Sequence, residues 1–156
     1  MSSEILRSRL EGTKLVVETA NGLETYDSQF LVAAVLIDVA RGSGQIEPEE
    51  SSQIIDLMEE HFHLDAAESL ELITRVMSEL ADKPTLVDLL MDLAPTLSEG
   101  DKEDIALMGL KVVAADGQRE VSEMEQFNKA MEALDASPET VHRAFDRYFE
   151  QTMPRS

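Results

Sequence analysis

The fold is decided by the stretch VARGSGQIEPEESSQI (Val39–Ile54), whose plan returns later in the chain as VVAADGQREVSEMEQF (Val112–Phe127). Each copy runs from an apolar segment through a glycine turn to isoleucine or valine, and then into a segment that opens with acidic residues. Similar links follow the two acidic segments, LDAAE at Leu64 and LDASPE at Leu134. One unit written twice in a chain predicts an internal duplication.

The segments that lead into the two turns are apolar on nearly every side. They read SQFLVAAVLIDVAR (28–41) and DIALMGLKVVAA (104–115). A helix without a polar face is typical of a buried position, so both are predicted to be core helices. Because neither half can cover its own apolar helix, we expect the two helices to pack against each other, related by an approximate twofold axis.

Other local signals place the remaining helices. Two pairs that fit a capping box, Asp65 with Glu68 and Ser98 with Asp101, mark two helix starts. A further helix is predicted over 83–93. It should end before Pro95, because proline disrupts an α-helix. The rest of the chain has apolar residues at helical spacing and no βαβ alternation. The sequence therefore predicts an all-α, compact bundle of about seven helices that arose by internal duplication.

The first 26 residues differ from this helical pattern. The segment TKLVVETANGLETY (13–26) holds Asn21 and Gly22 between apolar residues. Asn-Gly is a strong hairpin signal, because both central residues of a type I′ turn need positive φ. We therefore expect a short N-terminal hairpin or an extended arm over 1–26, followed by a helical domain over 27–151.

The chain is strongly acidic, with a formal net charge of −19 from 13 basic and 32 acidic residues. From Gly42 to Asp101 the only bases are Arg75 and Lys83. Such a surface repels phosphate, which argues against nucleic acid and anionic membranes as partners. A divalent cation, or an unidentified protein partner with a basic face, fits the charge. The need for a soluble surface is the simpler explanation for most of it.

The sequence has no cysteine and no apolar run of the roughly 20 residues that a membrane span needs. We expect a cytoplasmic protein without disulfides, thiolate chemistry or direct membrane insertion. The three histidines fit neither a Ser-His-Asp arrangement nor an HExxH motif. The chain is therefore expected not to be an enzyme.

The paired turns resemble the doubled motif of the TerB-like family, which is named for tellurite resistance. In that motif an Ala-Asp-Gly turn is followed by a branched aliphatic residue, an acid, often a proline, and glutamate. The matching residues are Gly44, Ile46, Pro48, Glu49 and Glu50 in the first copy, and Ala115, Asp116 and Gly117 in the second. The resemblance runs from about Gln29 to Glu150, and the first turn departs from it by having Gly42-Ser43 in place of Ala-Asp.

The resemblance implies an all-α fold, a role in resistance to tellurite and other stresses, and a metal site made of acids near the two turns. The candidate ligands are Asp38, Glu49, Glu50, Asp116 and Glu125. Asp38 and Asp116 lie near the C-terminal ends of the two apolar helices, where the helix dipole disfavours a carboxylate. Oxygen ligands of this kind suit Ca²⁺, Mg²⁺ or Mn²⁺.

The same acids also have ordinary structural explanations. Ser122 and Glu125 fit a capping box, and Glu49 and Glu50 suit the first turn of a helix. Asp116 can accept N–H groups from the backbone of its own turn. Neither stretch has the ligand spacing of an EF-hand. Three hypotheses remain open: a TerB-like domain that binds a cation or a protein, a metal-free interaction module, and a metal-assisted hydrolase.

Overall fold

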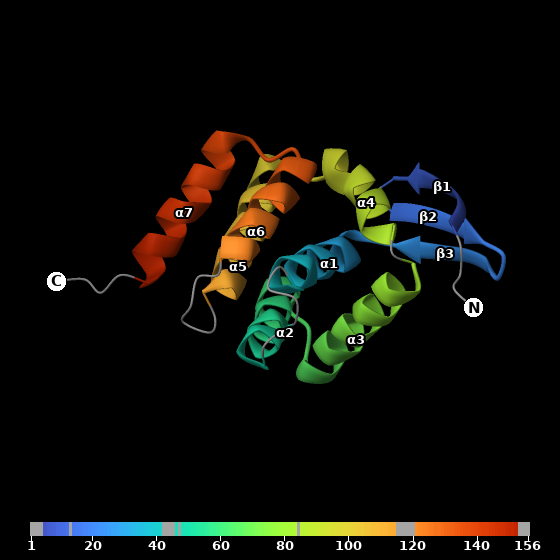
Figure 1. Cartoon of the computed structure of the whole chain (residues 1–156), viewed down its shortest axis with the longest axis horizontal. Helices are drawn as coiled ribbons and strands as arrows, with labels where there is room; N and C mark the ends of the chain where they lie inside the picture. The colour runs from blue at the N-terminus through green and yellow to red at the C-terminus, as the bar shows by residue number, and fades with distance from the viewer. Residues whose placement is uncertain are drawn as a thin grey trace. The chain divides into compact units, whose positions relative to one another are not determined.

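The computed structural model describes residues 5–12, 14–41, 46, 48–83, 85–114 and 121–152. Over these residues the chain forms seven α-helices and a three-stranded sheet, so the predicted all-α architecture with seven helices is confirmed (Figure 1). The elements are β1 (Ile5–Glu11), β2 (Lys14–Thr19), β3 (Gly22–Tyr26), α1 (Ser28–Ala40), α2 (Pro48–Phe62), α3 (Ala66–Asp82), α4 (Leu86–Leu90), the 3-10 helix η2 (Met91–Thr96), α5 (Glu99–Val113), α6 (Val121–Ala133) and α7 (Pro138–Thr152).

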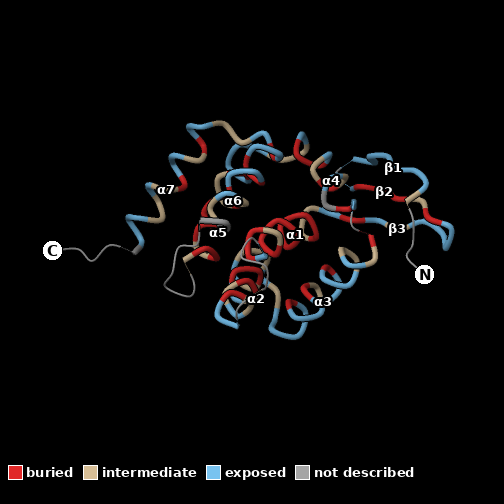
Figure 2. Tube along the Cα trace, in the orientation of Figure 1, coloured by how far each residue is buried: buried red, intermediate tan, exposed pale blue. Residues whose placement is uncertain are grey.

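The two apolar helices are buried, as predicted. Every residue from Phe30 to Ile37 in α1 and from Ile105 to Leu110 in α5 is buried. Figure 2 shows α1 as an almost unbroken buried segment, whereas α3 and α7 alternate between buried and exposed residues. The packing of the two helices against each other, and the duplication that it implies, stay predictions.

Both predicted capping boxes are present. The N–H of Glu68 donates to the Asp65 carboxylate at 2.8 Å, and the N–H of Asp101 donates to the Ser98 hydroxyl at 3.1 Å. In each pair the second residue's carboxylate accepts the N–H of the first. These bonds satisfy backbone donors that a helix start otherwise leaves without partners, so they fix where α3 and α5 begin.

The region predicted as one helix over 83–93 is divided. The α-helix α4 covers only Leu86–Leu90, and the chain continues as η2, which contains Pro95. The prediction that this proline lies beyond the helical segment is therefore wrong. Proline lacks an N–H, and in an α-helix its ring clashes with the carbonyl four residues earlier, so the turn before it is wound as a 3-10 helix instead.

The N-terminal segment forms an antiparallel sheet in the order β1-β2-β3, in which β2 and β3 make the predicted hairpin. The turn is displaced by one residue from the predicted position, because Thr19 pairs with Gly22 and the loop is Ala20-Asn21. The Thr19 hydroxyl holds this loop by accepting from the N–H of Asn21 and donating to the carbonyl of Gly22, both at 3.2 Å. Gly22 has a φ of 126°, which glycine adopts without a steric penalty.

One face of the sheet belongs to a hydrophobic core. Leu15, Val17 and Tyr26 are each at most 1% exposed, and β2 contacts η2. The residues of β1 differ, since all of them after Ile5 are exposed. The strand β1 is therefore an edge strand that contributes pairing to the sheet and little to the core.

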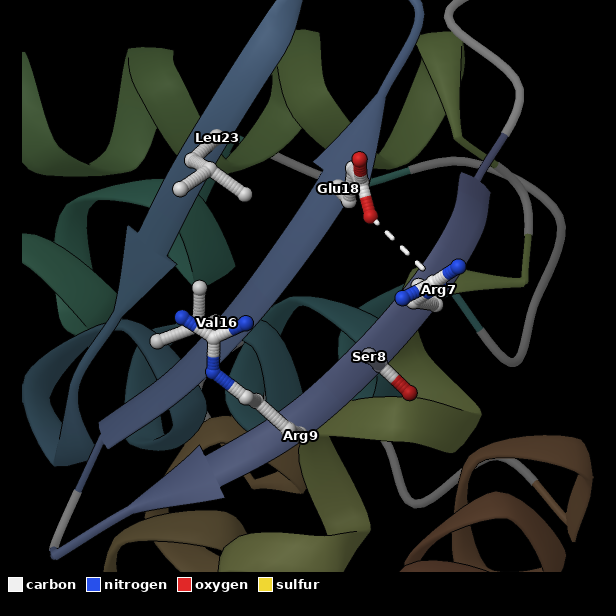
Figure 3. A pocket seen from close by; sticks show the side chains of 6 residues that line it. All are labelled: Arg7, Ser8, Arg9, Val16, Glu18 and Leu23. Atoms are coloured by element: carbon white, nitrogen blue, oxygen red, sulfur yellow. Dashed lines mark ion pairs between the residues drawn. The ribbon is translucent and has the colours of Figure 1, made fainter.

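The other face of the sheet is exposed and carries charged residues (Figure 3). Arg7 pairs with Glu18 across the strands at 3.6 Å. The side chain of Arg9 lies beside its strand partner Val16, which is only 6% exposed although it faces away from the core. The aliphatic part of an arginine can shield an apolar neighbour in this way while its charged end stays in water.

The chain divides into two compact units, and the division passes through α1 and α2. The first unit is Met1–Val35 with Ile55–Thr96, and contains the sheet, α3, α4 and η2. The second is Leu36–Ile54 with Leu97–Ser156, and contains α5, α6 and α7. The boundary predicted between 26 and 27 stays a prediction. Among the helices that the structure describes, none is both long enough and apolar enough to cross a membrane.

Candidate functional site

The second unit holds the ends of both copies of the repeated stretch. The end of α1, the start of α2 and the whole of α6 belong to it. Asp38, in the last turn of α1, is half-buried, and its Oδ2 accepts a hydrogen bond of 2.6 Å from the side-chain amide of Gln126 in α6. The residue just before the first copy is therefore in direct contact with a residue of the second copy.

The candidate glutamates differ in their surroundings. Glu49 and Glu50 both lie in the first turn of α2, yet Glu49 is exposed and Glu50 is 0% exposed. Glu125 is exposed on α6, next to Gln126. A fully buried carboxylate is rare in proteins, because removing its charge from water is costly. Glu50 is therefore more than a helix-start acid on the surface, and no sequence signal distinguishes it from Glu49.

The acids have the ligand chemistry that a divalent cation requires. Carboxylate oxygens are the ligands that Ca²⁺, Mg²⁺ and Mn²⁺ prefer, and the Asp38 carboxylate has lone pairs besides the one that Gln126 occupies. Asp116 lies outside the described residues. Within the described part of the chain, no three histidine, aspartate or glutamate side chains are grouped as a metal site.

A second cluster, in the first unit, links the sheet to the helices. Lys83 follows α3, and its side chain is 2% exposed. Its ammonium lies 2.8 Å from Glu24 of β3 and 2.5 Å from Glu79 of α3. The hydroxyl of Tyr26 contacts the same two carboxylate oxygens, at 2.8 Å for Glu24 and 2.7 Å for Glu79. The four groups form a closed ring, in which the ammonium donates to both carboxylates and the single phenolic proton donates to one of them at a time.

The protonation of this ring follows from its geometry. Burial lowers the pKa of Lys83, but the hydrogen bonds to Glu24 and Glu79 together outweigh it, so the pKa is raised overall. Burial and then the bonds to Glu79 and Glu24 raise the pKa of Tyr26. The hydrogen bond from Lys83 is the main cause that lowers the pKa of Glu24. A lysine and a phenol that both hold their protons are poor nucleophiles and bases, so the cluster is built for structure rather than catalysis.

Arg75 adds a second link between the sheet and α3. Its guanidinium lies over two rings, 5.4 Å from the centre of Tyr26 and 5.0 Å from the centre of Phe30, within the range of cation–π attraction. It also donates to the carbonyl of Thr25 at 3.4 Å. Sequence reasoning noted Arg75 and Lys83 as the only bases of the acidic middle segment and did not place them against the sheet. The only sequence feature that singled out these two residues was the scarcity of bases in that segment.

The hollow on the exposed face of the sheet is too small for a ligand. It is lined by Arg7, Ser8, Arg9, Val16, Glu18 and Leu23, as Figure 3 shows, and measures about 20 Å³. That is roughly the room of one water molecule. Its charged residues are also paired with each other, since Arg7 contacts Glu18 and Arg9 contacts Glu11 at 2.9 Å.

Comparison with known proteins identifies one family. The model of the family described as tellurite resistance protein TerB matches residues 29–146, from the start of α1 into α7. Both repeated stretches lie inside the match, and the N-terminal sheet lies outside it. No curated protein and no solved structure matches the chain significantly.

Proposed function

Because the chain belongs to the tellurite resistance protein TerB family, we propose that it is a non-enzymatic helical domain of a cytoplasmic stress response linked to tellurite or to metals. In this proposal the domain binds a divalent cation, Ca²⁺, Mg²⁺ or Mn²⁺, through the acids at the ends of its doubled unit. Its acidic surface also offers a binding face to a protein partner.

The contact between Asp38 and Gln126 carries the cation proposal. It brings the carboxylate that immediately precedes the first copy to α6, the helix that follows the second turn. The buried carboxylate of Glu50 belongs to the same unit. Two carboxylates withdrawn from water gain more from a cation than exposed ones do, because the surrounding dielectric constant is lower. Asp38, Glu50 and Asp116 would be the principal ligands, with Glu49 and Glu125 at the exposed side.

A metal-free interaction module is the second candidate, and Arg75 and Lys83, the two basic residues of the acidic middle segment, favour it. Lys83 is enclosed by Glu24 and Glu79, and Arg75 is directed at aromatic rings. These contacts occupy both bases of the middle segment, so neither is available to pair with the exposed acids of residues 55–96. Within residues 55–96, the acids that the structure shows as exposed are Asp56, Glu60, Asp65, Glu68, Glu71, Asp88 and Asp92.

Cation titration separates these two candidates. We expect Ca²⁺, Mg²⁺ or Mn²⁺ to bind in calorimetry and to raise the melting temperature, by on the order of 5 °C at a hundredfold excess over Kd. Asp38→Asn and Asp116→Asn should weaken binding. The matched control Glu60→Gln with Asp88→Asn removes two exposed acids elsewhere and should leave it unchanged.

Two results would contradict the cation proposal. One is an unchanged melting temperature with all three cations at millimolar concentration, which would leave the metal-free module. The other is equal weakening by the control pair, which would mean that cations gather around the acidic surface without a site. A hydrolase requires turnover of ester or phosphate substrates when the bound cation is present, and we expect none.

A further inference from the structure

The second unit contains an open groove between α6 and α7. It measures about 580 Å³ and is lined by Asn128, Met131, Glu132, Asp135, Ala136, Pro138, Val141, His142 and Phe145. The floor is apolar, with Met131, Val141 and Phe145 as its large side chains. The two acids of the lining, Glu132 and Asp135, are both exposed at the end of α6. The groove therefore joins an apolar surface to a negatively charged rim.

Phe145 is the central residue of this surface. It also lines a smaller, more enclosed hollow of about 110 Å³ with Leu110, Tyr148 and other apolar residues, so its ring borders two hollows. Beyond it, the Phe149 ring stacks at a centroid distance of 6.2 Å and is 39% exposed. The apolar side of α7 is thus only partly covered by its own unit.

The arginines of α7 do not face the groove. Arg143 contacts Glu103 of α5 at 2.7 Å, and Arg147 contacts Glu103 and Asp104 at 2.9 Å each. These pairs attach α7 to α5 along one side, and they engage the positive charges of the helix there. None of the described residues that line the groove is lysine or arginine. Lys102 of α5 donates to the backbone carbonyl of Asp135 at 3.3 Å but is only 6% exposed, so the exposed carboxylates of the lining are those of Glu132 and Asp135.

We propose that this groove is the docking site for a basic amphipathic helix of a partner protein. An apolar side chain of the partner would seat against Met131, Val141 and Phe145, and a lysine or arginine one turn away would pair with Glu132 and Asp135. The proposal rests on the proposed function, in which a protein partner binds the acidic surface, and it adds the site and the chemistry of the partner. Leu70 and Met77 on α3 are exposed as well, and the variants below test that helix as the alternative site.

A pair of peptides tests the charge and the shape of the partner together. The probe is a fluorescein-labelled peptide of leucine and lysine with helical periodicity, about four turns long, and its counterpart has glutamate in place of lysine. In anisotropy titrations of the full chain at about 0.15 M salt, the lysine peptide should bind and the glutamate peptide should not. Hydrogen exchange should slow in residues 128–149 when the lysine peptide is bound.

Isosteric variants then locate the site. Glu132→Gln with Asp135→Asn removes both rim charges and keeps the shape. Asparagine tolerates the positive φ of 57° at position 135. We expect this pair to weaken the lysine peptide roughly tenfold. The matched control, Glu60→Gln with Glu71→Gln, removes two exposed acids from α2 and α3 and should change binding less than twofold.

Three outcomes would overturn the inference. Equal weakening by both pairs would show a general attraction to an acidic protein, and a loss only in the control pair would move the site to α3. Hydrogen-exchange protection outside 128–149 would exclude the groove even if the affinities agreed. Asp38 and Asp116 are unchanged in these variants, so cation binding by the variants is an independent measurement. If the peptide does not bind in the groove, the cation proposal is unaffected.

Discussion

Lys83 is the residue on which the attachment of the sheet depends most directly. A lysine with a 2% exposed side chain loses most of its hydration, and only good ionic partners make that burial tolerable. Glu24 and Glu79 supply them, one from the sheet and one from α3. Since the two carboxylates would repel each other without the ammonium between them, the lysine holds together two elements that are far apart in the sequence.

Replacing Lys83 with methionine should lower the free energy of unfolding by about 2–3 kcal/mol. Methionine keeps the apolar length of the side chain but leaves the carboxylates of Glu24 and Glu79 facing each other and the Tyr26 hydroxyl. Urea unfolding followed by circular dichroism measures the change. Lys129→Met, which alters an exposed lysine of α6, is the control and should be neutral within about 0.5 kcal/mol.

Acid unfolding gives a second readout for the same prediction. The pKa of Glu24 is lowered in the folded protein, mainly by Lys83, so its contribution is present above the ordinary pKa of 4.5 and is lost as the pH falls below it. In the methionine variant this cause is gone, and stability should fall less steeply between about pH 5 and pH 3. An equally steep fall in both proteins would show that the ring does not stabilise the fold.

At the scale of elements, α5 and α6 approach closely at a glycine. A Cβ at Gly109 would lie 3.0 Å from two carbons of the Phe127 ring. That ring is 0% exposed and makes an edge contact with Phe145 at a centroid distance of 6.2 Å, so it has little room to move. The glycine is needed here for space, although it weakens the helix by its own backbone freedom.

Gly109→Ala should therefore destabilise the protein by about 1 kcal/mol, because the cost of overpacking exceeds the gain in helix propensity. Gly100→Ala in the first turn of the same helix is the control, since its Cβ would come no closer than 3.7 Å to another atom, the Ser98 hydroxyl oxygen. The control should be stabilised by up to about 1 kcal/mol. Urea denaturation of both variants decides the matter, and stabilisation of equal size in the two would mean that Phe127 moves freely.

The sequence predicted the elements better than it predicted their junctions. Periodicity and capping boxes located the buried helices and the starts of α3 and α5, because these signals act within one or two turns of chain. The predictions for Pro95 and for the turn after Thr19 were wrong, because in each case two local backbone geometries have similar energies. Glu50, Lys83 and the groove at Phe145 depend on which distant segment lies nearby, and a single sequence carries no such information.

For the whole molecule, the dominant physical fact is a net charge of −19 on 156 residues. Three of the cationic side chains that the structure describes are engaged at joins between elements: Lys83 at the sheet, and Arg143 and Arg147 between α5 and α7. Exposed acids are left to repel one another in solution, which opposes the folded state. Part of the positive charge thus attaches elements to one another, while most of the negative charge stays exposed.

The melting temperature should therefore rise by a few degrees when sodium chloride is increased from about 0.02 to 0.5 M. Screening weakens the repulsion among exposed acids more than it weakens the enclosed pairs of Lys83. Calorimetry in the presence of a chelator excludes any contribution from divalent cations. The variant with Glu60→Gln and Glu71→Gln should show a smaller rise, and a fall with salt would contradict this account.

The ring around Tyr26 also provides an optical signal for detachment of the sheet. The chain has two tyrosines and no tryptophan, so its near-ultraviolet absorbance comes mostly from phenols. While the sheet stays in place, the raised pKa keeps Tyr26 un-ionised in alkaline solution, and no phenolate band arises from it. Release of β3 exposes the hydroxyl to water and lets it ionise. An increase in absorbance near 295 nm (roughly the phenolate band) would therefore report the rate at which β3 detaches, without any added label.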